Sequence, residues 1–260
     1  MIKKILDDSG NDAGLIGTMG VFYKDKFYHT MNTSPESYDV FKYMREMLDN
    51  GVKYLVMEVS SQSLKLKRWS NVIFDYAVFT NLSLDHVGED EHDSFEDYKY
   101  CKSLLFKQCK TAILNSDSEY WKEMIKDTDC SIITYGKNSS ADYIIGSAKN
   151  IMSGGFVGIE MNVSGKLDDQ FRVSIPGLFT AYNACSAIVV CSLLGIDINN
   201  IKSSLLDVSV MGRMESINIS NKFSVLIDYA YQGIAMENVL STIRESNPTR
   251  IVSVFGCGGN

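Results

Sequence analysis

The stretch Val52-Lys53-Tyr54-Leu55-Val56-Met57-Glu58 is mostly apolar and ends on a carboxylate, as expected of a buried strand that leads into a site. A second apolar run, residues 72–80, is followed by the polar residues Asn81, Asp85 and His86. Ligands of open α/β sheets bind at the carboxyl ends of the strands. Two strands that both end in polar side chains therefore predict one shared site.

Helix-like and strand-like stretches alternate on both sides of these runs. The alternation predicts an α/β fold with a mostly parallel central sheet flanked by helices. A first clear helix is expected after Ser34, which fits an N-cap, and before Asn50-Gly51, a typical stop. Short segments broken by glycines over residues 142–175 predict a small antiparallel, β-rich insert. We also expect the end of a helix at residues 1–8, helices at residues 97–107, 181–194 and 234–246, and strands at residues 111–115, 131–135, 223–229 and 250–255.

Composition and charge exclude several classes of protein. With 45% hydrophobic and 22% charged residues, the 260-residue chain is expected to be globular rather than disordered. Its net charge of −7 argues against nucleic-acid binding, which needs a positive field. No apolar run is long enough to span a bilayer and no apolar core follows Lys3 and Lys4, so we expect no membrane insertion, no signal peptide and a cytoplasmic location. The six cysteines form no Cys-x-x-Cys pair, and we expect reduced, mostly buried thiols.

Two polar groups after the strands carry candidate chemistry. In Met57-Glu58-Val59-Ser60-Ser61, a carboxylate that can hold a hard cation stands beside hydroxyls that can bind a phosphate or a sugar. The simpler alternative is a strand-end glutamate followed by a serine turn. Asp85-His86 follows the second strand, but a loop histidine is more often an ordinary surface or hydrogen-bonded group than a metal ligand.

Lys102 shares one predicted helix face with Tyr98, Leu105 and Phe106, so a lysine stands inside an apolar stripe. The simpler interpretation is a side chain whose stem covers apolar surface while its ammonium group reaches water. The alternative is a desolvated lysine that is available for covalent modification.

These groups belong to an ordered set of short blocks, which covers residues 14–18, 32–36, 57–61, 78–82, 85–86, 98–106, 175–177, 182–184, 212–215, 228–230 and 254–259. Over essentially the whole chain, the set resembles the Mur ligases, the ATP-dependent amide ligases of peptidoglycan precursor synthesis. The resemblance implies a Mur ligase central domain over residues 1–210 and the first part of a Rossmann-like C-terminal domain over residues 211–260. It further implies that a third amino acid, expected to be a diamino acid, is joined to UDP-N-acetylmuramoyl-L-alanyl-D-glutamate through an acyl phosphate. The implied cofactors are ATP and Mg²⁺, and the implied state is a monomer.

The same resemblance assigns a metal site to three residues. It implies that Glu58 helps to hold a magnesium ion at the nucleotide phosphates, that His86 ligates a second ion, and that Lys102 is carbamylated. Carbamylation turns a cation into a carboxylate-like anion, which suits Mg²⁺. Lys99 is the alternative to Lys102.

Further residues match the nucleotide and substrate contacts of the family. Asn183 is expected to contact adenine, and Arg213 and Asp228 are expected to contact the nucleotide from the next domain. An arginine fork suits a carboxylate or a phosphate. The positions that match contacts to the UDP-muramoyl peptide are Thr33, Ser34, Ser60 and Arg68.

One part of the family pattern is missing. A phosphate loop of the Gly-x-x-Gly-Lys-Thr kind does not occur in the 260 residues, and the match would place it just before Met1. We therefore expect an internal part of a longer ligase, inactive by itself. Two alternatives stay open: a non-catalytic relative that binds a nucleotide or a partner, or a ligase of the folylpolyglutamate or cyanophycin type.

Overall fold

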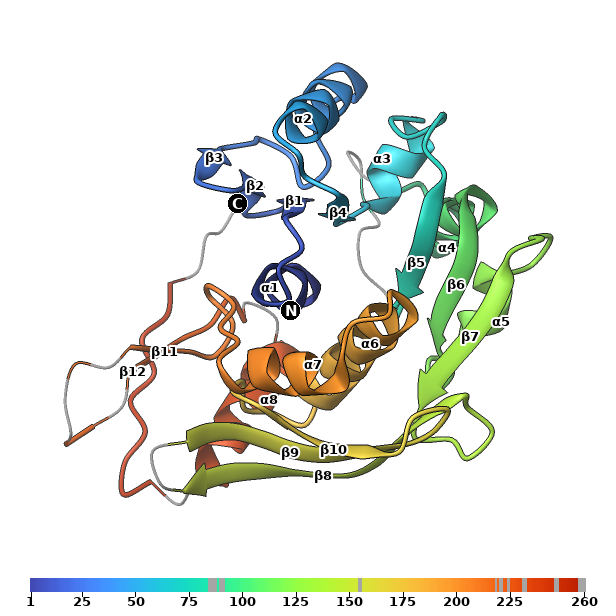
Figure 1. Cartoon of the computed structure of the whole chain (residues 1–260). Helices are drawn as coiled ribbons and strands as arrows, with labels where there is room; N and C mark the ends of the chain where they lie inside the picture. The colour runs from blue at the N-terminus through green and yellow to red at the C-terminus, as the bar shows by residue number, and fades with distance from the viewer. Residues whose placement is uncertain are drawn as a thin grey trace.

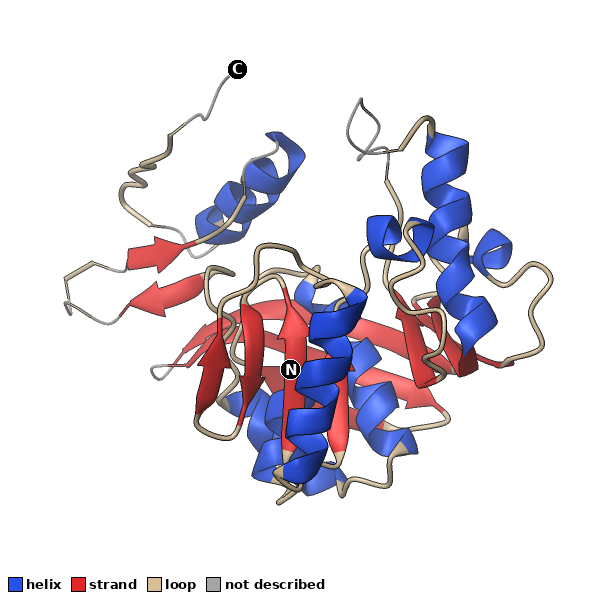
Figure 2. Cartoon of the chain, turned by 90° about the horizontal axis from the view of Figure 1, so that it is seen from above, coloured by secondary structure: helices blue, strands red, loops and turns tan. Residues whose placement is uncertain are grey.

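The structure of the chain is a computed structural model, which describes residues 1–83, 88, 92–153, 156–217, 219, 222–223, 225–230, 233–245 and 248–256. The described strands form a sheet of six strands, a sheet of four and a two-stranded ribbon, with helices on their faces (Figures 1 and 2). The predicted α/β fold class is confirmed. The described strands are divided between two main sheets, however, whereas the sequence pattern predicts one central sheet.

The six-stranded sheet changes from parallel to antiparallel pairing along its width. Its strands are β5 (Phe74–Phe79), β6 (Cys109–Asn115), β7 (Ser131–Gly136), β8 (Tyr143–Ser153), β9 (Phe156–Gly165) and β10 (Asp169–Val173). They lie in the order β10-β9-β8-β7-β6-β5, with parallel pairs from β5 to β8 and antiparallel pairs from β8 to β10. The predicted antiparallel insert over residues 142–175 is confirmed, and it extends this sheet.

Helices cover both faces of the six-stranded sheet. They are α4 (Phe95–Ser103), which continues as the 3-10 helix η1 (Leu104–Gln108), α5 (Trp121–Met124), α6 (Thr180–Leu193) and α7 (Ile198–Leu206). Ile113 of β6 packs with α6 and α7, while Ala112 and Leu114 pack with α4 and α5 on the opposite face. Burial on both faces explains why Ala112, Ile113 and Leu114 are apolar in succession. Figure 1 shows the sheet curling around α6 and α7.

The four-stranded sheet lies near the N-terminus of the chain. Its strands are β1 (Ala13–Gly17), β2 (Gly20–Tyr23), β3 (Lys26–Tyr28) and β4 (Tyr54–Met57), in the order β3-β2-β1-β4. The helices beside it are α1 (Ile2–Asp8) and α2 (Ser37–Asp49). Met47 of α2 packs on this sheet, whereas Ile5 of α1 joins the core of the six-stranded sheet. The β1 and β4 strands are parallel, so both end at the same edge.

The start of α2 differs from the prediction. Ser34 is not the N-cap, because the helix begins at Ser37 and Glu36 occupies the N-cap position. The Ser34 hydroxyl instead donates to the carbonyl oxygen of Glu58 at 2.9 Å and accepts from the backbone N–H of Ser60 at 3.0 Å. The Ser34 hydroxyl therefore bonds to a segment that is distant in the sequence, and it does not cap the start of α2.

Residues 211–256 form the least regular part of the described chain. A ribbon of β11 (Glu215–Ile217) and β12 (Val225–Ile227) precedes α8 (Gly233–Arg244), which matches the helix predicted at residues 234–246. The strand predicted at residues 223–229 is present only as the short β12. The strand prediction for residues 250–255 is wrong, since this described segment has no strand assignment and its Val254 is 94% exposed. An apolar sequence pattern does not by itself supply hydrogen-bond partners for the backbone N–H and C=O groups of a strand.

The cysteines of the described part are free thiols. Burial raises the pKa of Cys185 to about 12, which keeps this thiol protonated. Cys257 lies outside the described residues. Among the described helices, none combines the length and the apolar character that a bilayer span requires. The buried thiols are those of Cys101, Cys185 and Cys191, and the half-buried ones are those of Cys109 and Cys130.

Candidate active site

Glu58 follows β4 and lies beside Thr18, which follows the parallel strand β1. One carboxylate oxygen of Glu58 accepts hydrogen bonds from the backbone N–H of Thr18 at 2.9 Å and from its hydroxyl at 2.7 Å. The hydroxyl oxygens of Thr18 and Thr33 are 3.0 Å apart. Gly17 permits this approach, because a β-carbon there would lie 2.8 Å from the carboxyl carbon of Glu58. The result is a cluster of oxygen atoms, the kind of ligand that Mg²⁺ prefers.

Ser34, Ser60 and Arg68 form a second layer around Glu58. The Ser60 hydroxyl caps α3 (Ser61–Lys65), while its backbone N–H bonds to Ser34. Arg68 Nη1 donates to the carbonyl oxygen of Ser34 at 2.9 Å, and Nη2 contacts the carboxylate of Glu36. The Nε of Arg68 is buried without a hydrogen-bond partner among the described residues. Together with Thr33, the predicted substrate-binding residues therefore lie in one hydrogen-bonded network around Glu58.

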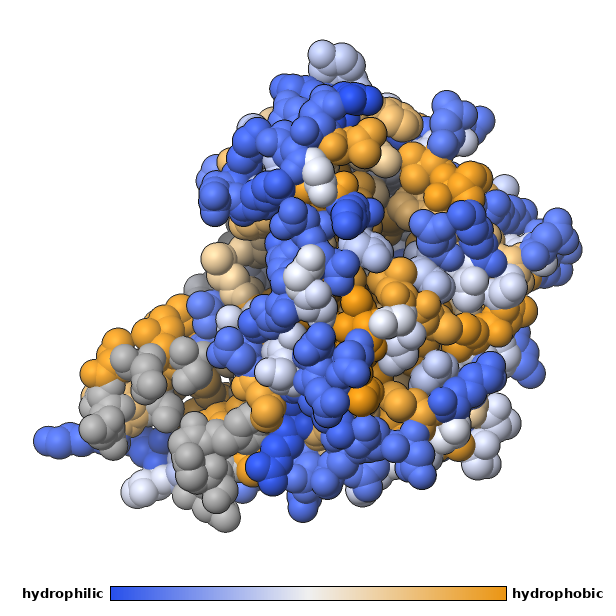
Figure 3. Space-filling model, viewed as in Figure 1, coloured by the Kyte–Doolittle hydropathy of each residue, from blue (hydrophilic) through white to orange (hydrophobic). Residues whose placement is uncertain are grey.

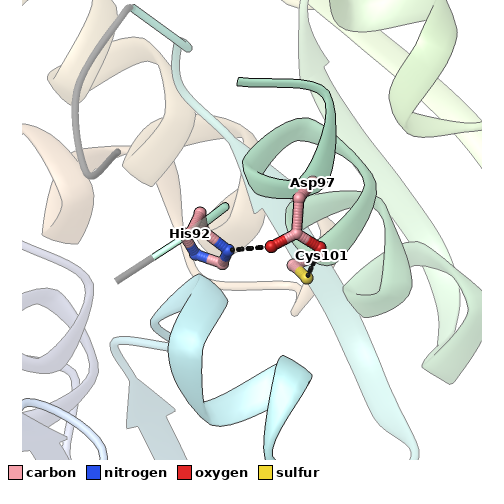
Figure 4. Close-up of side chains that lie close together, drawn as sticks. All are labelled: His92, Asp97 and Cys101. Atoms are coloured by element: carbon pink, nitrogen blue, oxygen red, sulfur yellow. Dashed lines mark hydrogen bonds and ion pairs between the residues drawn. The ribbon is translucent and has the colours of Figure 1, made fainter. Parts of the chain in front are cut away.

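A buried histidine that no sequence motif marks connects α3 to α4 (Figure 4). His92 Nδ1 lies 3.1 Å from Asp97 Oδ2, and His92 Nε2 lies 2.8 Å from the Ser61 hydroxyl. Lys65 Nζ donates to the same Asp97 oxygen at 2.7 Å, and this bond is the main reason that the pKa of Asp97 falls to about 2. Cys101 Sγ donates to the other Asp97 oxygen at 3.5 Å, and burial raises the pKa of this thiol to about 11.

The two candidate lysines on α4 have different surroundings. Lys102 is half-buried, with its Nζ 5.2 Å from the centre of the Tyr98 ring. Lys99 is held between two carboxylates, with its Nζ 2.9 Å from Glu96 and 2.6 Å from Glu123. Hydrogen bonding to Glu123 raises the pKa of Lys99, which keeps its amine protonated.

Side chains tie the carboxyl ends of β5, β6 and β7 together. Asn115 Nδ2 donates to the carbonyl oxygen of Thr80 at 2.7 Å, and the Tyr135 hydroxyl donates to the carbonyl oxygen of Phe79 at 3.3 Å. These bonds fix the start of the loop that runs toward His86. His86 itself, a predicted metal ligand, lies outside the described residues.

Asn183 is exposed near the start of α6. Its neighbour Tyr182 donates its hydroxyl to Asp117 at 2.9 Å, and burial raises the pKa of Tyr182 to about 12. Asp117 also accepts from the backbone N–H groups of Lys137 at 2.6 Å and Asn138 at 3.2 Å. Asp117 therefore joins the loops after β6 and β7 to the helix that carries Asn183.

Arg213 and Asp228 lie close to the same aromatic ring in the C-terminal part. The Arg213 guanidinium is 5.9 Å from the centre of the Tyr229 ring. Asp228 directly precedes Tyr229 and accepts two backbone N–H bonds, at 2.8 and 2.7 Å. Asp228 also lines a cavity of ≈1010 Å³, together with residues of α8 and residues 248–256. The two predicted nucleotide contacts thus lie beside one turn.

Comparison with known proteins gives concordant matches. The family model described as "Mur ligase middle domain" matches residues 1–191, and that described as "Mur ligase, glutamate ligase domain" matches residues 212–260. The chain is 40% identical to the UDP-N-acetylmuramoyl-L-alanyl-D-glutamate--2,6-diaminopimelate ligase of Caldanaerobacter subterraneus subsp. tengcongensis and 38% identical to ligase 1 of this name in Clostridium acetobutylicum. Each alignment covers 100% of this chain but 53% and 54% of these relatives, so the chain spans about half the length of the curated relatives it matches.

The solved structure of a UDP-N-acetylmuramoyl-L-alanyl-D-glutamate--2,6-diaminopimelate ligase has the same fold. Its TM-score is 0.80 at 24% sequence identity, and the match covers 100% of this chain and 53% of that one. At this level of identity, the likeness establishes the arrangement of the helices and strands.

Proposed function

The chain belongs to the Mur ligase family, and we propose that it forms the central part of a ligase that joins a third amino acid to UDP-N-acetylmuramoyl-L-alanyl-D-glutamate. The observation that carries this proposal is the network around Glu58, which gathers Thr33, Ser34, Ser60 and Arg68 at the end of a strand. The names of the relatives support a diamino acid as the third residue, since both are 2,6-diaminopimelate ligases.

The proposed activity needs a longer chain than these residues. The relatives are about twice as long, and a phosphate loop is absent from the 260 residues. We expect residues 1–260 alone to be inactive. The division into a central domain, residues 1–210, and the start of a C-terminal domain, residues 211–260, is also part of the proposal. Two family models that match residues 1–191 and 212–260 support it.

Glu58, His86 and Lys102 would hold Mg²⁺, which when bound neutralises the crowded charges of the phosphates. Both bonds from Thr18 go to one carboxylate oxygen of Glu58, so they fix the direction of the other. Lys102 would serve as a carbamate: its neutral amine adds to carbon dioxide, a C–N bond forms and one proton leaves. Lys99 suits this role less, because two carboxylates keep it protonated.

Arg68 and the hydroxyl groups near it would bind the UDP-muramoyl peptide. Arg68 lies in the same hydrogen-bonded network as Ser34 and Ser60, and the planar fork of its guanidinium suits a substrate carboxylate or phosphate. Held in this way, the substrate carboxylate attacks the γ-phosphate of ATP and releases ADP. The amine of the incoming amino acid then attacks the acyl phosphate and expels phosphate.

The nucleotide would lie between two parts of the chain. We propose that Asn183 contacts adenine and that Arg213 and Asp228 contact the nucleotide from the C-terminal part. The bond between Tyr182 and Asp117 supports the first assignment, because it fixes the helix turn that carries Asn183. A monomer located in the cytoplasm, where ATP and the precursor would be available, completes the proposal.

Two other functions make different predictions. A non-catalytic relative would bind nucleotide or a partner without turnover, even in its longest natural form. A ligase of the folylpolyglutamate or cyanophycin type would turn over with a folate or a cyanophycin primer and not with the UDP-muramoyl dipeptide.

The test is a ligation assay on the longest natural chain that contains these residues. ADP release with UDP-N-acetylmuramoyl-L-alanyl-D-glutamate and 2,6-diaminopimelate or lysine is the expected result, and turnover with folate or primer alone would overturn the substrate assignment. We expect Glu58→Gln to lower kcat by about 100-fold or more, since it removes an anionic metal ligand. Glu119→Gln, which changes an exposed carboxylate, is the matched control.

A further inference from the structure

The Asp97–His92–Ser61 relay has one consistent arrangement of protons when the imidazole is neutral. The Asp97 carboxylate is ionised and can only accept hydrogen bonds. His92 therefore donates from Nδ1 across 3.1 Å, which leaves the lone pair of Nε2 facing the Ser61 hydroxyl at 2.8 Å. Ser61 donates to that lone pair. The relay thus runs from a hydroxyl on α3 to a carboxylate on α4.

Burial decides what this relay can do. His92 is 1% exposed and Ser61 is 8% exposed, so neither side chain reaches a substrate as a base or a nucleophile. A metal ion fits poorly as well. The ligand atoms of His92, Asp97 and Cys101 lie within 4.8 Å of one another, but the Lys65 ammonium already neutralises the Asp97 carboxylate at 2.7 Å. The relay is a closed set of hydrogen bonds that can only hold its two ends together.

Those two ends belong to the helices on which the proposed site is built. The Ser60 hydroxyl caps α3, and Arg68 follows that helix closely in the chain. Lys102 stands on α4, little more than one helical turn beyond Asp97. Lys65 adds a direct ion pair from α3 to Asp97, beside the path through His92.

We propose that His92 is a positioning residue, which keeps the substrate contacts on and beside α3 in register with Lys102 on α4. The proposal rests on the function proposed above and assigns a role in it to a side chain that touches no reactant. A displacement of about 1 Å between reacting groups can cost about 100-fold in rate. Loss of the relay should therefore slow the reaction while leaving the nucleotide contacts in place.

The first test is kinetic and uses the longest natural chain with Ser61→Ala, which removes the hydroxyl from the relay. We expect kcat to fall about 10- to 100-fold while the KM for ATP stays within about twofold. Ser61→Thr, which keeps the hydroxyl, should recover most of the rate. Ser70→Ala, at an exposed serine beyond α3, is the control. A kcat for Ser61→Ala that equals the control value would overturn the proposal.

The second test needs no activity and separates the relay from the ligase proposal. In amide hydrogen exchange on the 260-residue chain, Ser61→Ala should speed exchange at residues 97–103 by about tenfold or more and leave β8 and β9 unchanged. Equal exchange of α4 in Ser61→Ala and Ser70→Ala would show that the relay does not hold this helix, whatever the enzyme does. If the longest natural chain without any substitution ligates nothing, only the proposed function fails.

Discussion

The segments at residues 111–115 and 250–255, each predicted from the sequence to be a strand, differ in the structure. The first lies in β6, between β5 and β7, with Ile113 fully buried. The second has no strand assignment, and Phe255 is 68% exposed. Figure 3 shows apolar surface where Figure 1 draws β11 and β12, in the same C-terminal part. Similar sequence patterns thus give a core strand only where neighbouring strands are present to pair with it.

The largest expected difference between the two regions is in the cost of removing an apolar side chain. Ile113→Ala should lower the free energy of unfolding by about 3 kcal/mol, because it leaves a cavity in the core. Val254→Ala should change it by less than about 0.5 kcal/mol, because Val254 is 94% exposed. Urea unfolding followed by the fluorescence of the two tryptophans, Trp69 and Trp121, measures both. Equal costs would remove the distinction between the regions.

A glycine in each region offers a finer comparison. Gly165 has φ +98°, and a β-carbon would lie 2.4 Å from the carbonyl oxygen of Asp142, so Gly165→Ala must distort paired backbone. Gly212 has φ +68°, but its β-carbon would meet the side chain of Tyr229, which is 60% exposed and can move. We expect destabilisation of about 2 kcal/mol for Gly165→Ala and about 1 kcal/mol for Gly212→Ala. Thermal unfolding of both variants tests this order, and the reverse order would contradict it.

The smallest expected effect is the pH dependence that Asp97 gives to the first region. Its pKa is about 2 in the folded chain, below the ordinary 3.8, so its contribution to stability is complete above about pH 4 and is lost as the pH falls toward 2. Because the side chain is a quarter exposed, we expect only about 1 kcal/mol. Urea titrations at pH 5 and pH 2.5 should show that Asp97→Asn lacks this loss. Asp168→Asn, at an exposed carboxyl, should retain it.

A helix can be predicted from the sequence where neighbouring residues supply both its apolar pattern and the residues that begin or end it. The apolar helix α6 lacks a polar face, and α2 ends at Asp49, followed by the C-cap residue Asn50 and by Gly51, which has φ +77°. Our expectations from the sequence include no helix at residues 198–206, although a local signal is present there, since Asp197 caps α7 by accepting from the N–H of Asn199 at 2.8 Å. Partners far away in the chain decide the rest. The Ser34 hydroxyl bonds to the carbonyl oxygen of Glu58, at the end of β4, instead of capping α2, and no local sequence pattern indicates this contact.

The candidate site shows the same limit. The residue types at Glu58, Ser60 and Arg68 are enough to suggest polar chemistry at this point of the chain. Thr18 bonds to Glu58 across 40 residues of sequence, and Ser61 bonds to His92 across 31. Such separations follow from the path of the chain, so no spacing rule reveals them. The signal that could identify Thr18 is its place in the block at residues 14–18.

The β8–β9 hairpin also bears on how the chain reaches its fold. Its strands follow one another directly, from Tyr143 paired with Gly165 to Ser153 paired with Phe156. Such hairpins form in about 1–10 μs. Phe74 of β5, by contrast, pairs with Cys109 of β6 only after the intervening chain, with α4 inside it, has closed into a loop. The hairpin is therefore the natural early folding unit of a sheet whose parallel pairings form slowly.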